Sequence, residues 1–244
     1  MRRGLAFCAV LAVTCAVLSS AEVWDTKPFA QWTDKELEKL LNDSPWAGKA
    51  SLTHARPGAN LGSVPDWKLI IAVRSALPMR QALVRGDIGA GGTPNAAHQE
   101  LLAADEPLYL VSIGGIPRTF AAQLQAVADA ATIKPKGKAA IQASQASAMM
   151  FDKDGKPVQA SALLTQAQTA RVAQRGGGRG GGGTGGGGAV DNSGITVTLV
   201  LGFPKDTPIT AQDQEFEVAT VLGAYNVKRT FKLKDMLFMG ALAL

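Results

Sequence analysis

The stretch WKLIIAVRSALPMRQAL, residues 67–83, predicts a β-strand that leads directly into an α-helix. A period of two places one set of apolar side chains on the core face of this strand, namely Trp67, Leu69, Ile71 and Val73. Pro78 fits the first turn of the helix, where its missing N–H group costs nothing. Met79 and Leu83 are four residues apart, so we expect them to form the inward face of the helix.

Upstream, the stretch WTDKELEKLLNDSPW at residues 32–46 predicts a short helix with several agreeing signals. Thr33 is a good N-cap residue, and Glu36 three positions later completes a capping box. Trp32 and Leu37 occupy the two positions of a hydrophobic staple across the cap. We expect the helix to end before Pro45.

Downstream, apolar patterns predict a strand at 107–113 that stops at Gly114–Gly115, a helix over 119–131 and a strand at 148–151. Residues 162–172 have a weak helical pattern. The last part of the chain contains four consecutive apolar patterns that predict an antiparallel meander: 195–203, 216–222, 227–233 and 236–244. The predicted fold is therefore α+β, a largely antiparallel sheet or sandwich of about six to eight strands with two or three short helices.

The N-terminal residues have the pattern of a secretory signal peptide. Arg2 and Arg3 precede an uncharged, mostly apolar run at 5–18, and Ser19 and Ala21 supply small residues before a cut after Ala21. The apolar run is short for a membrane span, and no second one follows. We expect residues 1–21 to be a signal peptide, residues 22–244 to form a single exported domain, periplasmic or secreted, and no transmembrane span to remain after processing.

Both cysteines, Cys8 and Cys15, lie in the predicted signal peptide. The processed chain then has no thiol, which excludes disulfides, cysteine nucleophiles and thiolate metal sites. The formal net charge is +5, and Arg2 and Arg3 contribute two of these charges. Such a mild charge favours neither a dedicated polyanion binder nor an acidic disordered chain.

The segment 176–188 contains eleven glycines in thirteen residues. This composition buries almost no side-chain surface, so we expect a disordered insertion within the domain. Arg175 and Arg179 give it some likeness to the RGG tracts of nucleic-acid-binding proteins. Two arginines are few and export separates the chain from RNA, so we expect no nucleic-acid partner.

The sequence contains none of the common catalytic motifs. His54 and His98 lie in segments rich in Gly, Pro and Asn, and there is no Gly-x-Ser-x-Gly or His-Glu-x-x-His motif. Asp152 and Asp154 precede a glycine as in calcium loops, but the further ligands of such a loop are missing. We therefore expect no catalytic residues, no metal site and no cofactor.

An anion site at the end of the central strand is the one binding site that the sequence suggests. Arg74 ends the polar face of the strand beside Ser75, and Arg80 lies in the following helix. Free N–H groups at a helix N-terminus favour negative charge, so an anionic group fits beside these residues. The alternative is that Arg74 pairs within the protein with a carboxylate such as Asp235 or Glu217.

Four blocks of the sequence resemble a family of uncharacterised exported proteins of acidobacteria. The blocks are WTDKELEKLLNDSPW, RSALPMRQAL, FPKDTPIT and FKLKDM, and they are spread over most of the chain after residue 21. Proteins of this family often carry a glycine-rich insertion. The resemblance implies export and a single family domain, and it implies no activity, ligand or catalytic residue.

We expect an exported envelope or secreted protein that acts as a non-enzymatic binding or structural domain, with an envelope or extracellular partner. One alternative is a hydrolase that uses carboxylates, and another is an outer-membrane-associated component. A deep pocket lined by two or more carboxylates would favour the hydrolase. A flat apolar patch would favour the binding domain.

Overall fold

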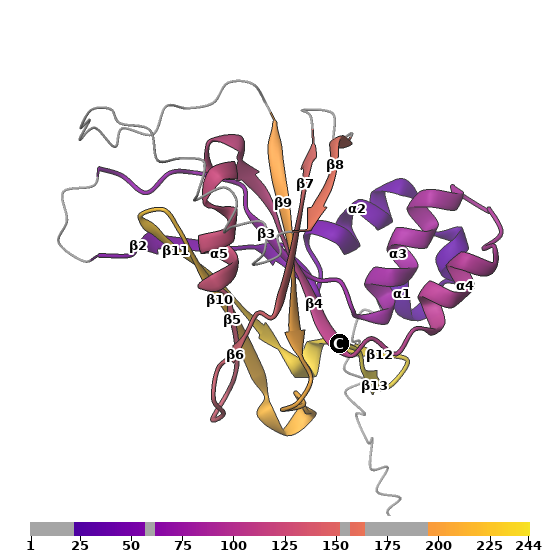
Figure 1. Cartoon of the computed structure of the whole chain (residues 1–244). Coiled ribbons are helices and arrows are strands. Elements are labelled where there is room, and N and C mark those ends of the chain that lie inside the picture. The colour runs from indigo at the N-terminus through magenta and orange to yellow at the C-terminus, as the bar shows by residue number, and fades with distance from the viewer. Residues whose placement is uncertain (1–21, 57–61, 152–156, 164–194) are drawn as a thin grey trace, which may run out of the picture.

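The computed structural model describes residues 22–56, 62–151, 157–163 and 195–244. These residues form two large antiparallel β-sheets whose inner faces share one apolar core, a separate two-stranded sheet near the C-terminus, and helices on two sides (Figure 1). The predicted α+β class is therefore confirmed. The described residues contain thirteen strands and five α-helices, more of each than the sequence predicts.

The larger sheet has the strand order β1-β3-β4-β9-β7-β8. Its strands are β1 (Ala47–Lys49), β3 (Ile70–Val73), β4 (Leu108–Pro117), β7 (Gln145–Phe151), β8 (Pro157–Leu163) and β9 (Thr196–Pro204). The predicted strand at 67–73 is present as β3, although only its last four residues are paired. Within the sheet, β3 lies between β1 and β4, and Ile71 and Val73 point into the core opposite Ile113 and Val111.

The smaller sheet has the strand order β2-β11-β10-β5-β6. Its strands are β2 (Ser51–His54), β5 (Thr132–Pro135), β6 (Ile141–Gln142), β10 (Glu215–Leu222) and β11 (Tyr225–Lys232). Of the strands predicted for the meander at 195–233, only β10 and β11 pair with each other in the described structure. The predicted four-strand meander is wrong because β9 belongs to the larger sheet. A clean apolar alternation fits a strand of either sheet, so the pattern alone does not choose between them.

The chain passes from the larger sheet to the smaller one at Ala50, directly between β1 and β2. This crossing ties the two sheets together along one edge. Strand β11 continues beyond the point where β2 ends, because the last paired residues of the two strands are Lys228 and Ser51. Beyond Lys228, the edge of β11 therefore has no partner residue in β2.

The core between the sheets is built by alternating inward residues, as expected for a sandwich. From the larger sheet it includes Leu199, Leu201 and Phe203, none of which is exposed to solvent. From the smaller sheet, the rings of Phe216 and Phe231 stack with their centroids 5.0 Å apart.

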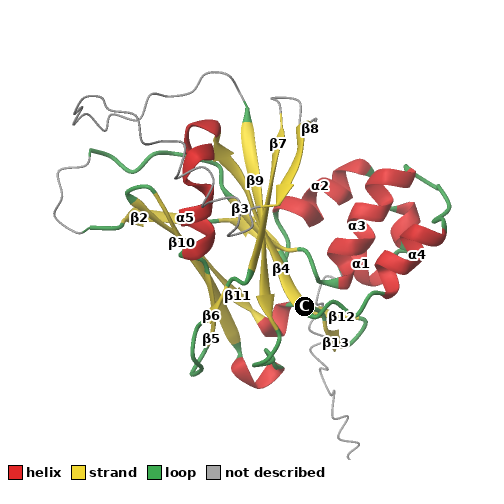
Figure 2. Cartoon of the chain, in the orientation of Figure 1, coloured by secondary structure: helices red, strands yellow, loops and turns green. Residues whose placement is uncertain are grey.

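Four helices lie together on one side of the sheets, and a fifth lies on the other side (Figure 2). The group of four consists of α1 (Val23–Thr26), α2 (Asp34–Asn42), α3 (Leu77–Ile88) and α4 (Ala96–Ala103), and the fifth is α5 (Leu124–Asp129). The predicted capping box of α2 is confirmed: Glu36 N donates to Thr33 Oγ1 and Thr33 N donates to a Glu36 carboxylate oxygen. Pro78 lies in the first turn of α3, as predicted.

Several predicted boundaries are wrong. Helix α3 extends to Ile88, and Leu83 is 42% exposed rather than inward. Strand β4 continues through Gly114–Gly115 as a bulge, because Gly115 adopts a φ of +79° that lets the strand resume. The predicted C-terminal strand is divided into β12 (Leu237–Phe238) and β13 (Ala241–Leu242).

Residues 118–123 form a 3-10 helix that leads into α5, so the predicted helix over 119–131 is largely correct. The predicted strand at 148–151 is the end of β7. The predicted helix at 162–172 is wrong at its start, where Ala162 and Leu163 belong to β8, and its remainder lies outside the described residues. The segment with Asp152 and Asp154 and the glycine-rich segment 176–188 also lie outside them.

Candidate functional site

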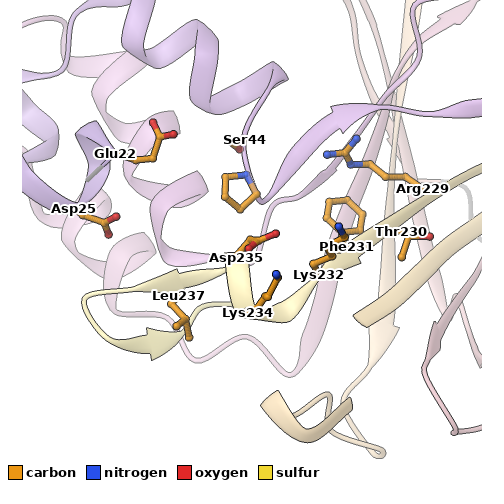
Figure 3. Close-up of a pocket in the computed structure, with 11 residues that line it drawn as sticks. Glu22, Asp25, Ser44, Arg229, Thr230, Phe231, Lys232, Lys234, Asp235 and Leu237 are labelled. Atoms are coloured by element: carbon orange, nitrogen blue, oxygen red, sulfur yellow. The ribbon is translucent and has the colours of Figure 1, made fainter. Parts of the chain in front are cut away.

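A cleft of about 690 Å³ lies between the beginning of the described chain and the end of β11 (Figure 3). We call it the β11 cleft. One wall comes from the start of α1 and from the turn after α2, and the other comes from β11 and the short 3-10 helix at Leu233–Asp235. The lining residues are Glu22, Asp25, Ser44, Pro45, Arg229, Thr230, Phe231, Lys232, Lys234, Asp235 and Leu237.

Arg229 is held rigidly in the wall of the β11 cleft. Its Nη1 donates to Lys49 O at 3.1 Å and its Nη2 donates to Ala47 O at 3.4 Å. The guanidinium carbon lies 5.0 Å from the centre of the Phe231 ring, which is a cation–π distance. Position 48 is glycine, and a Cβ atom there would lie 2.5 Å from the guanidinium carbon. The bare backbone of Gly48 therefore makes room for the arginine.

The charge of Arg229 has no direct counterion in the described part of the chain. No carboxylate there lies within salt-bridge distance of its guanidinium group, and its buried Nε has no hydrogen-bond partner. Burial lowers the pKa of Arg229, and the negative charge of Asp43 partly offsets this effect. A partly buried cation that is bonded only to neutral carbonyl groups retains an attraction for an external anion.

The charged side chains of the β11 cleft are distributed unevenly between its two sides. Glu22 and Asp25 lie on the α1 side, whereas Arg229 and Lys232 lie on the β11 side (Figure 3). Glu22 is paired with Lys39 at 2.8 Å outside the lining. The α1 side is therefore acidic through Asp25, and the β11 side has a net positive charge because Arg229, Lys232 and Lys234 outnumber Asp235.

The carboxylates of the β11 cleft do not have the surroundings of a catalytic acid. Asp25 and Asp235 are exposed, and Glu22 is only half-buried. A general acid needs burial or a like charge close by to hold its proton near neutral pH. The buried hydroxyl of Ser44 donates to Leu40 O and accepts from Trp46 N, so it is not activated by a base. This arrangement is suited to binding rather than to bond cleavage.

The structure places Arg74 partly buried at the end of β3. Its Nε donates to the buried hydroxyl of Ser112 at 2.8 Å. Burial lowers the pKa of Arg74. Neither of the carboxylates considered as internal partners pairs with it: Glu217 lies 3.7 Å from Lys228, and Asp235 lines the β11 cleft. Among the described residues, no other carboxylate forms a salt bridge with Arg74.

The two other residues of the predicted anion site have partners in the protein. Ser75 is buried, and its hydroxyl accepts a hydrogen bond from Leu110 N. Arg80 donates through Nη1 to Leu101 O and Ala104 O at the end of α4, where a cation is favourable. Both arginines keep unused donors in the described chain: the outer nitrogens of Arg74 have no protein partner, and the buried Nε of Arg80 has none.

The two histidines are far apart in the fold and have separate structural contacts. His98 Nε2 lies 2.7 Å from Asp87, and its Nδ1 accepts from Asn95 N in the capping box of α4. His54 packs against Tyr225 with the ring centres 5.5 Å apart. No cluster of His, Cys, Asp and Glu suitable for a metal ion occurs among the residues that the structure describes.

No protein-family model, curated protein or solved structure matches this chain. Over the described ranges, the helices are too short or too polar to cross a membrane.

Sequence reasoning did not predict the β11 cleft. Its residues come from three separate parts of the chain, at 22–25, 44–45 and 229–237, and no local motif links them. One signal was present: Arg229 stands at an otherwise apolar position of β11, between Val227 and Phe231 on the inward face. A cation in that register indicates either a buried partner or a cleft.

Proposed function

We propose that this protein is an exported, non-enzymatic binding domain that holds its ligand in the β11 cleft. The observation that carries the proposal is Arg229, a cation fixed by two backbone carbonyls and an aromatic ring beside a cleft of about 690 Å³. A cleft of this size is within the usual range for small-ligand and peptide sites. Export is supported by the signal-peptide pattern of residues 1–21.

A hydrolase is the second candidate, because three carboxylates line the same cleft: Glu22, Asp25 and Asp235. Two catalytic carboxylates need unequal environments, so that one carboxyl group keeps its proton while the other is ionised. Here Asp25 and Asp235 are both exposed to solvent, so their environments do not differ in this way. The geometry therefore favours binding over hydrolysis.

Export is tested by the intact mass of the protein recovered from the periplasm or the medium. We expect a chain that begins at Glu22. Recovery of most of the exported protein with residues 1–21 still attached would contradict processing after Ala21.

Binding is tested by capture from an envelope extract with three forms of the protein. The double variant Lys232→Glu/Lys234→Glu reverses the charge at the cleft. Lys134→Glu changes an exposed lysine of β5 that does not line the cleft, so it is the matched control. We expect the wild type and the control to retain the same ligand and the double variant to retain at least about tenfold less.

Equal retention by all three forms would rule out the β11 cleft as the binding site. Conversion of the captured ligand during incubation with the wild type, abolished by Asp235→Asn, would instead support the hydrolase.

A further inference from the structure

The edge of β11 is unpaired where it enters the β11 cleft. A two-residue turn joins β10 to β11, with Leu222 opposite Tyr225. In such a hairpin the closing pair exchanges hydrogen bonds, and every second residue then points its backbone groups toward the partner strand. Arg229 and Phe231 therefore face β10, whereas Thr230 and Lys232 face the opposite side.

On that opposite side, β2 ends before it reaches these residues. The last pair is Lys228 with Ser51. Lys49 would lie opposite Thr230 if β2 continued, but it belongs to β1 in the other sheet, and its carbonyl accepts from Arg229. Lys232 is also the N-cap residue of the 3-10 helix at Leu233–Asp235, so its carbonyl accepts the first bond of that helix. No described strand pairs with this side of Thr230 and Lys232. The N–H groups of Thr230 and Lys232 and the C=O group of Thr230 are thus available at the cleft.

We propose that an extended peptide segment of a partner protein binds in the β11 cleft by adding a strand to β11 at Thr230 and Lys232. This inference rests on the proposed binding function and specifies its ligand. An added strand satisfies the open backbone groups of the edge, which is the usual source of affinity in this mode of recognition. At about 3.3 Å per residue, a segment of four to six residues is about 13–20 Å long.

The charges of the cleft specify the composition of the peptide. An acidic side chain beside Arg229 and Lys232 and a basic side chain beside Glu22 and Asp25 match the two charged regions. Such complementarity sets the direction of the peptide as well as its affinity. A peptide with one acidic and one basic residue, separated along an extended backbone, fits both regions.

A second copy of this protein fits the edge less well than a single segment. The wall formed by Ser44, Pro45 and the start of α1 faces the open edge across the cleft. In a symmetric pair, the same wall on the second copy would also stand in front of its own β11 edge. A single extended segment has no such wall of its own.

The test uses a library of acetylated and amidated hexapeptides with the four central positions randomised, selected on the wild-type protein. We expect enriched peptides to carry an acidic and a basic residue at separate positions. Methylation of the backbone nitrogens that face β11 should weaken the best peptide at least about tenfold, because each methyl group removes a ladder hydrogen bond. This arm uses the unaltered protein, so it does not depend on the folding of a variant.

Two variants provide the complementary arm. Thr230→Pro removes the outward N–H group and leaves the ladder with β10 intact, since Thr230 does not donate to β10. Thr230→Val keeps the N–H group and is the matched control. We expect about tenfold weaker binding for Thr230→Pro and unchanged binding for Thr230→Val.

Selection on a third variant, Lys232→Glu, should enrich peptides that carry a basic residue at the position where the wild type selects an acidic one. The proposal is overturned if no peptide is enriched, if N-methylated peptides bind as tightly as the parent, or if the isolated protein forms dimers that Thr230→Pro dissolves. A ligand that depends on Lys232 and Lys234 but not on the Thr230 N–H group would leave the proposed binding function standing and reject the peptide strand.

Discussion

The guanidinium group of Arg229 lies against the backbone of Gly48. It occupies the space that a side chain at position 48 would need. A Cβ atom at Gly48 would be 2.5 Å from the guanidinium carbon and from both terminal nitrogens. Through this contact, the smaller sheet supplies donors to the carbonyls of Ala47 and Lys49 at the edge of the larger sheet. The arginine thus covers the edge of β1, and the edge of β11 beside it stays open.

We predict that Gly48→Ala destabilises the protein by about 1–3 kcal/mol, because the displaced guanidinium loses its charge-assisted hydrogen bonds. In an Arg229→Ala background the same change should be neutral or stabilising by a few tenths of a kcal/mol, since alanine costs less backbone entropy than glycine. Urea unfolding of the wild type, the two single variants and the double variant measures both effects and their coupling. Equal effects of Gly48→Ala in both backgrounds would contradict the contact.

Amide hydrogen exchange should distinguish the two sides of β11. We predict slow exchange for the amides of Arg229 and Phe231, which face β10, and exchange at least about tenfold faster for those of Thr230 and Lys232. On addition of a strand-forming peptide, only the second pair should become protected. Slow exchange of all four amides in the free protein would mean that the edge is already covered.

Local signals predicted the elements whose boundaries depend on neighbouring residues in the sequence. The capping box of Thr33 and Glu36 and the position of Pro78 were correct because both are set within one helical turn. The alternation of β10 and β11 was correct for the same reason. These features together fix the fold class.

Long-range choices were not predictable from these signals. The pattern of β9 specifies a strand but not a sheet, and β9 pairs with β4 and β7 in the larger sheet. The β11 cleft depends on two such choices: the crossing at Ala50 that ends β2, and the approach of α1 to the 3-10 helix near Asp235. The inward-facing Arg229 is the one residue in the local sequence of β11 that indicates either feature.

Glu36 should make the protein sensitive to acid. Hydrogen bonds from Thr33 and Lys27 lower the pKa of Glu36 to about 2. Because the folded pKa is below the unfolded value of 4.5, the unfolded chain binds a proton more readily, and stability falls as pH decreases from about 5 to about 2. Glu36→Gln keeps the capping geometry and does not titrate, so its stability should fall less over this range in urea unfolding. An unchanged pH dependence would contradict this assignment.

Arg74 allows the predicted anion site to be tested separately from the β11 cleft. With no carboxylate paired to it in the described chain, Arg74→Met leaves no buried opposite charge behind, and it keeps an apolar stem to pack. We therefore predict a loss of about 1 kcal/mol, which is a decrease of about 2–4 °C in Tm for a chain of this size. Inorganic phosphate should raise the Tm of the wild type and not that of Arg74→Met.

Arg80→Met is the comparison for this experiment, because Arg80 already donates to Leu101 O and Ala104 O. If Arg80 has only this structural role, its variant should lose stability and keep the response to phosphate. A loss of the response in both variants would place Arg80 in the site with Arg74, as the sequence suggested. A loss of 3 kcal/mol or more for Arg74→Met, with no effect of phosphate on either protein, would show that Arg74 stabilises the fold and binds no external anion.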